Sequence, residues 1–377
     1  MWWERRFLRT GESWANGGTL KLDLPTSGIL GSIMVRAERA GVTDAFNDQY
    51  KWRLIDYISK VEVIGNGSTP IKSFTGEVAR GLTCFDGGGL SPDQEFNYGS
   101  STKRAHFMLN FGRRLWDRKY GLDLSRWNNV QLQLTNDGSS TFFGGAWSAD
   151  ILMYIMRGDG VPVPQGYFRT EEVQNWTTVQ NERKYITLPQ DHKLRRILLH
   201  VIPAHGTNDN ADTQSYNVVD DIELYIRSKR EKLFDASLRF LWYENYFSLG
   251  RNFLTHLEPY HTGGNGVKTG LGQVLAKAMG QMPQGGTPGA NTVAVEPGND
   301  GDTQKLLRTG TDNYSWLMSG LGPENCAVID LAPDIEDPGT WLDLAKEKDV
   351  NLDVHTADSA SADNGVVRVI TDRLIQG

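Results

Sequence analysis

The sequence predicts an all-β fold of two tandem, eight-stranded antiparallel jelly rolls (a double jelly roll), with a long loop inserted in the second. Three observations support this prediction: an internal repeat, segments in which apolar and polar residues alternate, and many turn signals. The chain has 377 residues, more than one domain usually holds, and contains 41 glycines and 11 tryptophans. Glycines are typical of turns and tryptophans of packed apolar surfaces, so the composition favours an all-β protein.

The repeat begins with residues 20–25 and 184–189, which both alternate apolar and polar side chains and both end in proline. Pro25 and Pro189 are 164 positions apart. Residues 58–64 then match residues 219–225 at an offset of 161. Because every half-buried strand has the same two-residue period, one match means little, but several matches in the same order indicate a duplicated domain.

The last block of the repeat is the clearest. Residues 122–124, Leu-Asp-Leu, recur at 342–344, and residues 130–134 recur at 350–354, both at an offset of 220. Phe107, Leu109 and Phe111 fall on Ala327, Ile329 and Leu331 at that same offset.

The rise in offset from 161 to 220 puts about 59 extra residues into the second copy, inside the window 250–322. Glycine and proline are frequent there, which predicts a long surface loop. Residues 271–279 show helical spacing of apolar side chains, so a short helix is expected within the loop.

The strand pattern divides the chain into four parts. Each copy carries about eight strand-length segments with short connections, and one sheet alone cannot bury both its faces, so each copy is expected to close as a two-sheet sandwich. Pro162 and Pro164 stiffen the join between the copies. The predicted parts are an N-terminal arm at 1–15, a first jelly roll at 16–160, a linker at 161–175, and a second jelly roll at 176–377 with the inserted loop at about 250–322.

Composition argues against several classes of protein. The formal net charge is −7, so we expect no direct sequence-specific binding to nucleic acid. Cys84 and Cys326 are too few for a disulfide framework or a cysteine-based zinc site. The sequence has no apolar run long enough to span a bilayer, and residues 1–6 lack the apolar stretch of a secretory signal, so we expect assembly in a cytoplasm.

No residue pattern predicts catalysis, and we expect no catalytic residue, cofactor or metal. His256 and His261 stand beside a glycine-rich stretch that ends in Lys268, but Val267 occupies the place where a phosphate-binding loop needs glycine. A solvated loop is the simpler interpretation. Two carboxylate clusters are also explained by a strand end or a helix start more simply than by a glycosidase pair: Asp220, Asp221 and Glu223, and Asp334, Glu336 and Asp337.

The N-terminal segment is the strongest candidate for a contact surface. Aromatic and basic side chains interleave there, namely Trp2, Trp3, Arg5, Arg6, Phe7 and Arg9. Such residues suit the headgroup layer of an anionic membrane, or they insert into a neighbouring subunit, or the segment folds back on its own domain.

A second aromatic group lies in the second copy, at Trp242, Tyr243, Tyr246 and Phe247. We expect it to pack in the core of the second sandwich, and an exposed interface patch is the alternative.

A tandem of jelly rolls with a loop inserted in one copy and an arm before the first resembles the double jelly-roll major capsid proteins of tailless icosahedral viruses with an internal membrane, such as the tectiviruses. The resemblance extends over nearly the whole chain and is carried by residues 20–35, 58–64 and 122–135 and by their copies at 185–199, 222–226 and 342–354.

The resemblance implies a non-enzymatic building block of the virion, assembled in the host cytoplasm as a homotrimer with pseudo-hexagonal outline that contacts neighbouring capsid trimers. It also implies that the insertion forms an outward tower, and that the arm faces the internal membrane or minor capsid proteins. Two alternatives remain open: a glycan-cleaving amidase built from two jelly rolls, with acidic residues at their junction, and a carbohydrate-binding or adhesive β-protein.

Overall fold

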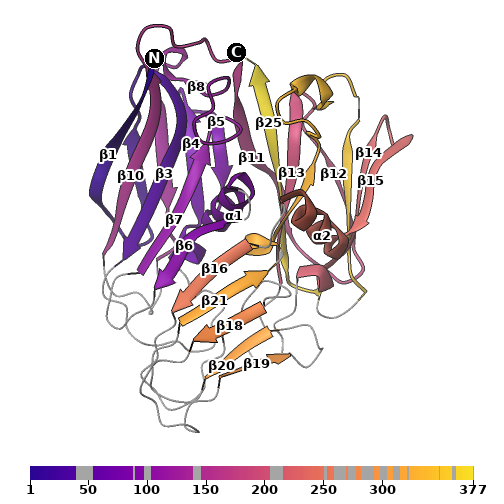
Figure 1. Cartoon of the computed structure of the whole chain (residues 1–377). Helices are drawn as coiled ribbons and strands as arrows, with labels where there is room; N and C mark the ends of the chain where they lie inside the picture. Colours follow the sequence, from indigo (N-terminus) through magenta and orange to yellow (C-terminus); the bar gives the residue numbers. More distant parts are fainter. Residues whose placement is uncertain are drawn as a thin grey trace.

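Two β-sandwiches stand side by side in the computed structural model, and a group of short strands projects from one end of the pair (Figure 1). Both chain termini lie at the other end. The structure describes residues 1–39, 54–87, 90–96, 103–138, 146–203, 215–249, 253–258, 269–270, 277–281, 293–297, 304–308, 315–320, 322–347, 349–358 and 362–376. For residues 90–96, 103 and 249 and for the described residues between 253 and 320, only the backbone is described.

The first sandwich consists of two antiparallel sheets that face each other. One sheet has the order β1 (Trp2–Trp14), β10 (Trp147–Arg157), β3 (Ile29–Arg39) and β7 (Lys103–Asn110). The other has the order β2 (Thr19–Asp23), β9 (Val130–Thr135), β4 (Lys60–Gly65) and β5 (Thr69–Phe74).

The second sandwich repeats this arrangement strand for strand. Its first sheet has the order β11 (Gly166–Thr177), β25 (Val366–Gln376), β13 (Lys193–Ile202) and β22 (Cys326–Asp330). Its second sheet has the order β12 (Arg183–Thr187), β24 (Asn351–Thr356), β14 (Val219–Ile226) and β15 (Glu231–Ser237). The shared strand order confirms the predicted fold class, two jelly rolls in tandem.

Alternation within the strands builds each core. In β9, Leu132 pairs with Leu22 on one side and Val63 on the other, so one row of apolar side chains crosses three strands. All three side chains are buried. The polar residues between them point to solvent, as the two-residue period of a strand requires.

The segments predicted as arm and linker are instead equivalent strands. β1 pairs with β10 along its length, and β11 pairs with β25 in the same way, so each is the first strand of its jelly roll. The sequence does not predict these strands, because bulges interrupt their pairing, between Phe7 and Arg9 and between Glu172 and Gln174, and polar side chains interrupt their alternation. The first jelly roll therefore starts at β1, and the second at β11.

Each jelly roll also carries one helix that the sequence did not reveal, α1 (Gly76–Asp86) or α2 (Leu238–Leu249). Both helices bind the edge strand of their own sandwich in the same way. Thr83 in α1 accepts a hydrogen bond from the backbone N–H of Met108 (2.9 Å), and Asn245 in α2 accepts one from that of Val328 (2.8 Å). These pairs show that α2 is the copy of α1.

Short elements complete the two jelly rolls. They are the two-residue strands β8 (Leu122–Asp123) and β23 (Leu342–Asp343) and the 3-10 helices η1 (Leu54–Tyr57), η2 (Leu124–Arg126), η3 (Ser215–Asn217), η4 (Pro323–Asn325) and η5 (Pro338–Thr340).

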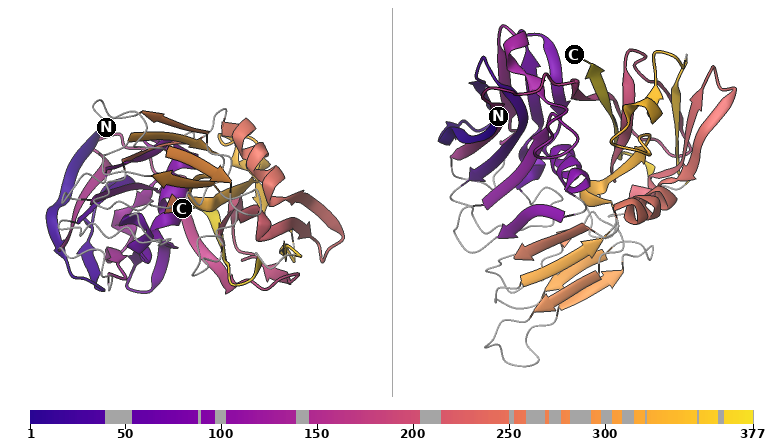
Figure 2. Two further views of the ribbon diagram at one scale, coloured as in Figure 1. Left: turned by 90° about the horizontal axis from the view of Figure 1, so that it is seen from below. Right: turned by 45° about the horizontal axis from the view of Figure 1, so that its top comes forward.

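The insertion lies between α2 and η4, the window that the offsets predict, and it projects below the two sandwiches (Figure 2). It contains short strands where a loop was expected: β16 (Phe253–Glu258), β17 (Thr269–Gly270), β18 (Lys277–Gln281), β19 (Val293–Pro297), β20 (Gln304–Arg308) and β21 (Ser315–Gly320). The helix expected at 271–279 is a strand from Lys277 onward, and residues 271–276 lie outside the described residues. β6 (Leu90–Phe96) of the first jelly roll pairs with β16, so both copies contribute to the projection.

One sheet runs through both sandwiches. β5, the edge strand of the first jelly roll, pairs in parallel with β11, the edge strand of the second, with Lys72 opposite Thr170 and Ser73 opposite Glu171. Shared backbone hydrogen bonding of this kind joins the two jelly rolls at a fixed orientation.

Candidate functional site

The predicted contact residues lie along β1, the outermost strand of the first sheet. Trp2 and Phe7 are 58% and 55% exposed, Arg5, Arg6 and Arg9 are exposed, and Trp3 is half-buried. The segment thus folds on its own domain, one of the three interpretations considered, and still presents aromatic and basic groups at the surface.

Trp3 belongs to an aromatic cluster that the sequence did not reveal. Its ring meets Trp116 edge-on at 5.3 Å, and Trp116 meets Tyr154 at 5.2 Å. Gly31 makes room for Trp3, since a Cβ atom there would lie 2.8 Å from the indole. Arg5 lies over the Trp116 ring, 6.0 Å from its centroid. The cluster depends on strand pairing, so no local sequence signal predicts it.

An apolar row extends from this cluster across the outer face of the sheet. Phe7 of β1 pairs with Leu152, Leu152 with Met34, and Met34 with Met108. Residues opposite each other in an antiparallel sheet share a face. Leu152, Met34 and Met108 are half-buried and Phe7 is exposed, so the row is open to solvent in the isolated chain.

The second aromatic group is divided between the core and the surface. Trp242 is buried, and its indole N–H donates to the carbonyl oxygen of Cys326 (3.1 Å). On the opposite side of α2, Phe240, Tyr243 and Phe247 are 68%, 37% and 76% exposed. Their spacing of three and four residues puts them in one stripe along the helix.

A buried network of charges holds the two jelly rolls together. The Lys72 ammonium donates to the Thr170 hydroxyl (2.6 Å), which donates to Asp372 (2.7 Å). Arg195 and Arg196 of β13 reach both Asp372 and Asp86, with nitrogen–oxygen distances of 2.9 to 3.4 Å.

Three cations therefore face two carboxylates in this network. Burial lowers the pKa of Lys72 to about 8, and the nearby Asp372 and Asp86 offset that effect only in part. Burial acts to raise the pKa of Asp86, but Arg196 and Arg195 hold it below its usual range. The carboxylates at the junction are thus engaged by arginines and form no acid–base pair open to a substrate.

The predicted carboxylate clusters have structural roles. Glu336 forms ion pairs with Arg113 (2.5 Å) and Arg114 (3.1 Å), and Asp337 caps η5 by accepting the Gly339 N–H (2.8 Å).

On the second jelly roll, carboxylate oxygens of Asp221, Glu223 and Asp235 lie within 4.8 Å of one another. Burial and the charges of Asp235 and Glu223 raise the pKa of Asp221. Lys232 donates to Glu223 (2.6 Å) and to Asp235 (2.8 Å), so a cation already occupies part of this cluster. Asp235 was not singled out from the sequence.

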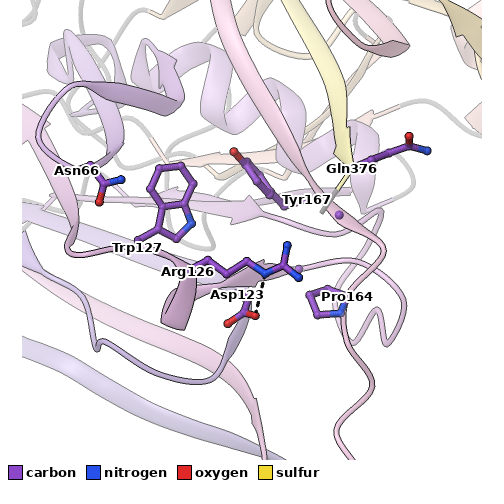
Figure 3. A pocket seen from close by; sticks show the side chains of 9 residues that line it. Asn66, Asp123, Arg126, Trp127, Pro164, Tyr167 and Gln376 are labelled. Carbon is purple, nitrogen blue, oxygen red and sulfur yellow. Dashed lines mark ion pairs between the residues drawn. The ribbon is translucent and has the colours of Figure 1, made fainter.

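A pocket of about 320 Å³ opens beside the C-terminus, between the first jelly roll and the start of β11 (Figure 3). Trp127 and Tyr167 form its aromatic wall, with ring centroids 6.2 Å apart, and Arg126 pairs with Asp123 at its rim (3.4 Å). Its lining has neither a nucleophile beside a base nor a pair of free carboxylates.

The histidines weighed as ligands do not form a site among the described residues. His256 lies in β16, where only the backbone is described, and His261 is outside the described residues. No helix in the described part of the chain is long and apolar enough to span a membrane.

No protein-family model matches the chain, and no curated protein matches it. Solved structures are similar over nearly its whole length. That of Sulfolobus Turreted Icosahedral Virus is 12% identical, covering 99% of this chain and 91% of that chain with a TM-score of 0.61. The major capsid protein P2 from Bacteriophage PM2 is 14% identical, covering 99% and 98% with a TM-score of 0.51. The PBCV-1 virus capsid is 10% identical, covering 99% and 93% with a TM-score of 0.56. The resemblance to double jelly-roll capsid proteins is thereby confirmed at the level of the fold.

Proposed function

We propose that the protein is the major capsid protein of an icosahedral virus, a structural building block whose work is to bury surface between copies. One observation carries this proposal: the whole chain, both jelly rolls and the insertion included, is covered by capsid proteins that are themselves covered almost end to end. A shared jelly roll alone would be weak support, since that fold serves many functions, but a full-length match to the tandem is far more specific.

In the proposed particle, three chains form a trimer with pseudo-hexagonal outline, because each chain contributes two similar sandwiches. The insertion points outward, since it projects from the end opposite both termini. Trp2 and Trp3 lie near the other end, where an internal membrane or minor capsid proteins would be met. The protein acts in the virion and assembles in the host cytoplasm.

The surface of the isolated chain agrees with this function. Exposed aromatic side chains lie in two separate places, on β1 and on α2. Large exposed apolar groups are typical of surfaces that become buried on association. No arrangement of described side chains favours the amidase alternative, because the junction carboxylates are engaged by arginines.

Size-exclusion chromatography with light scattering tests the proposal. We expect the purified protein to elute with the mass of three chains at micromolar concentration. An obligate assembly of this kind buries about 2,000 Å² or more at each contact, so the trimer should persist on dilution. A monomer at every concentration would refute the proposed function.

A further inference from the structure

The pocket beside the C-terminus has a composition that the packing of a shell does not require (Figure 3). Its volume of about 320 Å³ lies at the lower end of the range for small-molecule sites. The rings of Trp127 and Tyr167 are inclined at 73° to each other, so they form an aromatic corner. Arg126 and Asp123 add charged groups at the rim. The lining therefore suits a ligand that has both an apolar face and polar groups.

The internal repeat separates the contacts that the fold needs from those that the pocket adds. At the offset of 220, Asp123 corresponds to Asp343, and each accepts the backbone N–H two residues further on (3.1 and 3.2 Å). Arg126 corresponds to Lys346 at the same offset. Each of these basic residues pairs with its aspartate, at 3.4 and 3.2 Å. The capped turn and its ion pair are thus shared features of the two jelly rolls.

The aromatic corner has no copy in the second jelly roll. Trp127 corresponds to Glu347, which pairs with Arg227 (2.8 and 3.1 Å). One part of the Trp127 ring rests on Gly65, where a Cβ atom would lie 2.3 Å from the indole. Gly65 corresponds to Ile226 at the offset of 161. Since the second jelly roll forms the same turn without an indole or the glycine that admits it, the turn itself does not require them.

The polar groups of the lining remain available to a ligand. Within the described part of the chain, the Trp127 indole N–H, the Tyr167 hydroxyl and the Gln376 amide form no hydrogen bond. Arg126 uses only its Nε atom in the ion pair at the rim. Asn66 uses its side-chain oxygen to accept one backbone N–H (2.9 Å), which leaves its amide nitrogen. Five side chains around one pocket can therefore donate hydrogen bonds to a bound molecule.

The charges at the rim select against ions. Among the described residues that line the pocket, only Asp123 and Arg126 are charged, and their charges cancel. The carboxylate would repel an anion, and the guanidinium would repel a cation. The inclined rings also leave no parallel pair between which a flat aromatic ligand could stack. The ligand that fits is uncharged, with one apolar face and an edge of hydrogen-bonding groups.

We propose that this pocket binds a neutral pyranose sugar. A pyranose ring presents C–H groups on one face, which pack on an aromatic ring, and hydroxyl groups around its edge. Trp127 supplies the apolar surface, Tyr167 closes the corner, and Arg126 and Asn66 donate to the hydroxyl oxygens. Binding of the sugar goes beyond the proposed function and does not depend on it.

The position of the pocket indicates where the sugar comes from. Gln376 borders the pocket, and the C-terminus lies at the end of the molecule opposite the insertion (Figure 1). If the insertion points outward, the pocket opens toward the interior of the particle, where the source would be the headgroup of a membrane glycolipid. This assignment of the source, unlike the sugar chemistry, rests on the proposed function.

Saturation-transfer NMR with the methyl glycosides of glucose, galactose and mannose tests the site. At least one should bind with a dissociation constant of about 1–10 mM, as expected for a ligand of roughly a dozen non-hydrogen atoms. Inorganic phosphate and phosphocholine should not displace it. If none of the three sugars binds, or if phosphate or phosphocholine occupies the pocket instead, the proposal is overturned.

Substitutions locate the bound sugar. Trp127→Gln should weaken binding at least about tenfold, because it removes the apolar surface. The second jelly roll folds with Glu347 at this position, and circular dichroism verifies that the variant folds. Arg126→Ala should weaken binding at least about threefold through the loss of hydrogen bonds. Lys346→Ala, the matching change in the second jelly roll, should have no effect.

Tyr167→Phe keeps the ring and removes only the hydroxyl, so it tests the pocket even if Trp127→Gln does not fold. It should weaken binding at least about threefold, whereas Tyr185→Phe alters an exposed tyrosine elsewhere and should not. Wild-type affinity in Tyr167→Phe and Arg126→Ala would place the sugar outside this pocket and overturn the proposal.

Vesicle binding distinguishes the sources, and light scattering separates this proposal from the proposed function. Co-sedimentation with phosphatidylcholine vesicles that contain a monoglucosyl lipid, but not with vesicles that lack it, supports the headgroup; binding of the methyl glycosides alone supports a free sugar. A monomer that binds sugar refutes the shell and leaves this site standing. A stable trimer that binds no sugar does the reverse.

Discussion

At the scale of single residues, the junction between the jelly rolls is held together by charged side chains that no sequence pattern predicts. Lys72, Arg195 and Arg196 face Asp86 and Asp372 in a buried space where each charge needs a partner. These residues lie on four different elements, so only the folded chain brings them together. Because three cations face two carboxylates, we expect each carboxylate to contribute more to the free energy of unfolding than Lys72 does.

Asp372→Asn should destabilise the chain by about 3–5 kcal/mol, because it leaves Asp86 to balance the charges of both buried arginines and of Lys72. Lys72→Met should cost no more than about 1 kcal/mol, since it removes the surplus cation and Thr170 can still donate to Asp372. Denaturant unfolding of both variants checks the contrast, and equal losses would contradict this account of the network.

The pH dependence of stability should reveal Lys72. Its pKa is about 8 in the folded chain and 10.5 ordinarily, so between these values the unfolded chain binds one proton more. Stability should therefore rise with pH across this window, by up to about 1.4 kcal/mol per unit. The comparison is with Lys72→Met, which lacks this contribution; parallel stability curves for the two proteins would show that Lys72 titrates normally.

At the scale of elements, the repeat predicts the strands whose alternation is clean and misses those whose alternation is broken. β2, β4 and β9 bury every second residue, and the offsets to their copies β12, β14 and β24 locate the insertion. β1 and β11 carry bulges and polar runs, so their sequences indicate an arm and a linker and not strands. α2 is apolar on both faces, and therefore shows no amphipathic period.

The candidate contact residues could be predicted only in part. The interleaved aromatic and basic residues of β1 are visible in the sequence. Trp116, the Met34 row and Asp235 are not, because strand register and pairing between distant segments decide their positions. Half-buried residues such as Met34 are indistinguishable in the sequence from core residues one position away.

If β1 is an integral strand, a chain lacking residues 1–12 should be less stable by at least about 3 kcal/mol. The deletion removes Leu8 and Trp3 from their packing and frees the edge of β10. Thermal unfolding and solubility give the readout. A truncated chain with wild-type stability would show that these residues form an arm outside the fold.

The hydrogen bonds between Asn245 of α2 and Val328 of β22 should also contribute to stability. Asn245→Leu leaves both the N–H and the carbonyl oxygen of Val328 without their partner, at an expected cost of about 1–3 kcal/mol. Ser248→Ala on the exposed side of α2 should change stability by less than about 0.5 kcal/mol. Similar losses for the two variants would argue against the role given to Asn245.

At the scale of the whole molecule, duplication explains both the fold and the proposed assembly. α1 of the first jelly roll packs against the second jelly roll. α2 packs only on its own jelly roll in the described part of the chain, and its other side is exposed. In the proposed particle, the two similar jelly rolls of each chain allow three chains to form a ring with pseudo-hexagonal outline. Because only the second jelly roll carries the insertion, each chain would add one projection to the outward face of that ring.

Negative-stain imaging of the purified protein tests the central claim most directly. We predict ring-shaped particles with pseudo-hexagonal outline and three projections on one face, one from each chain. Isolated two-lobed particles with a single projection would contradict the account, because they would show that the chain does not assemble.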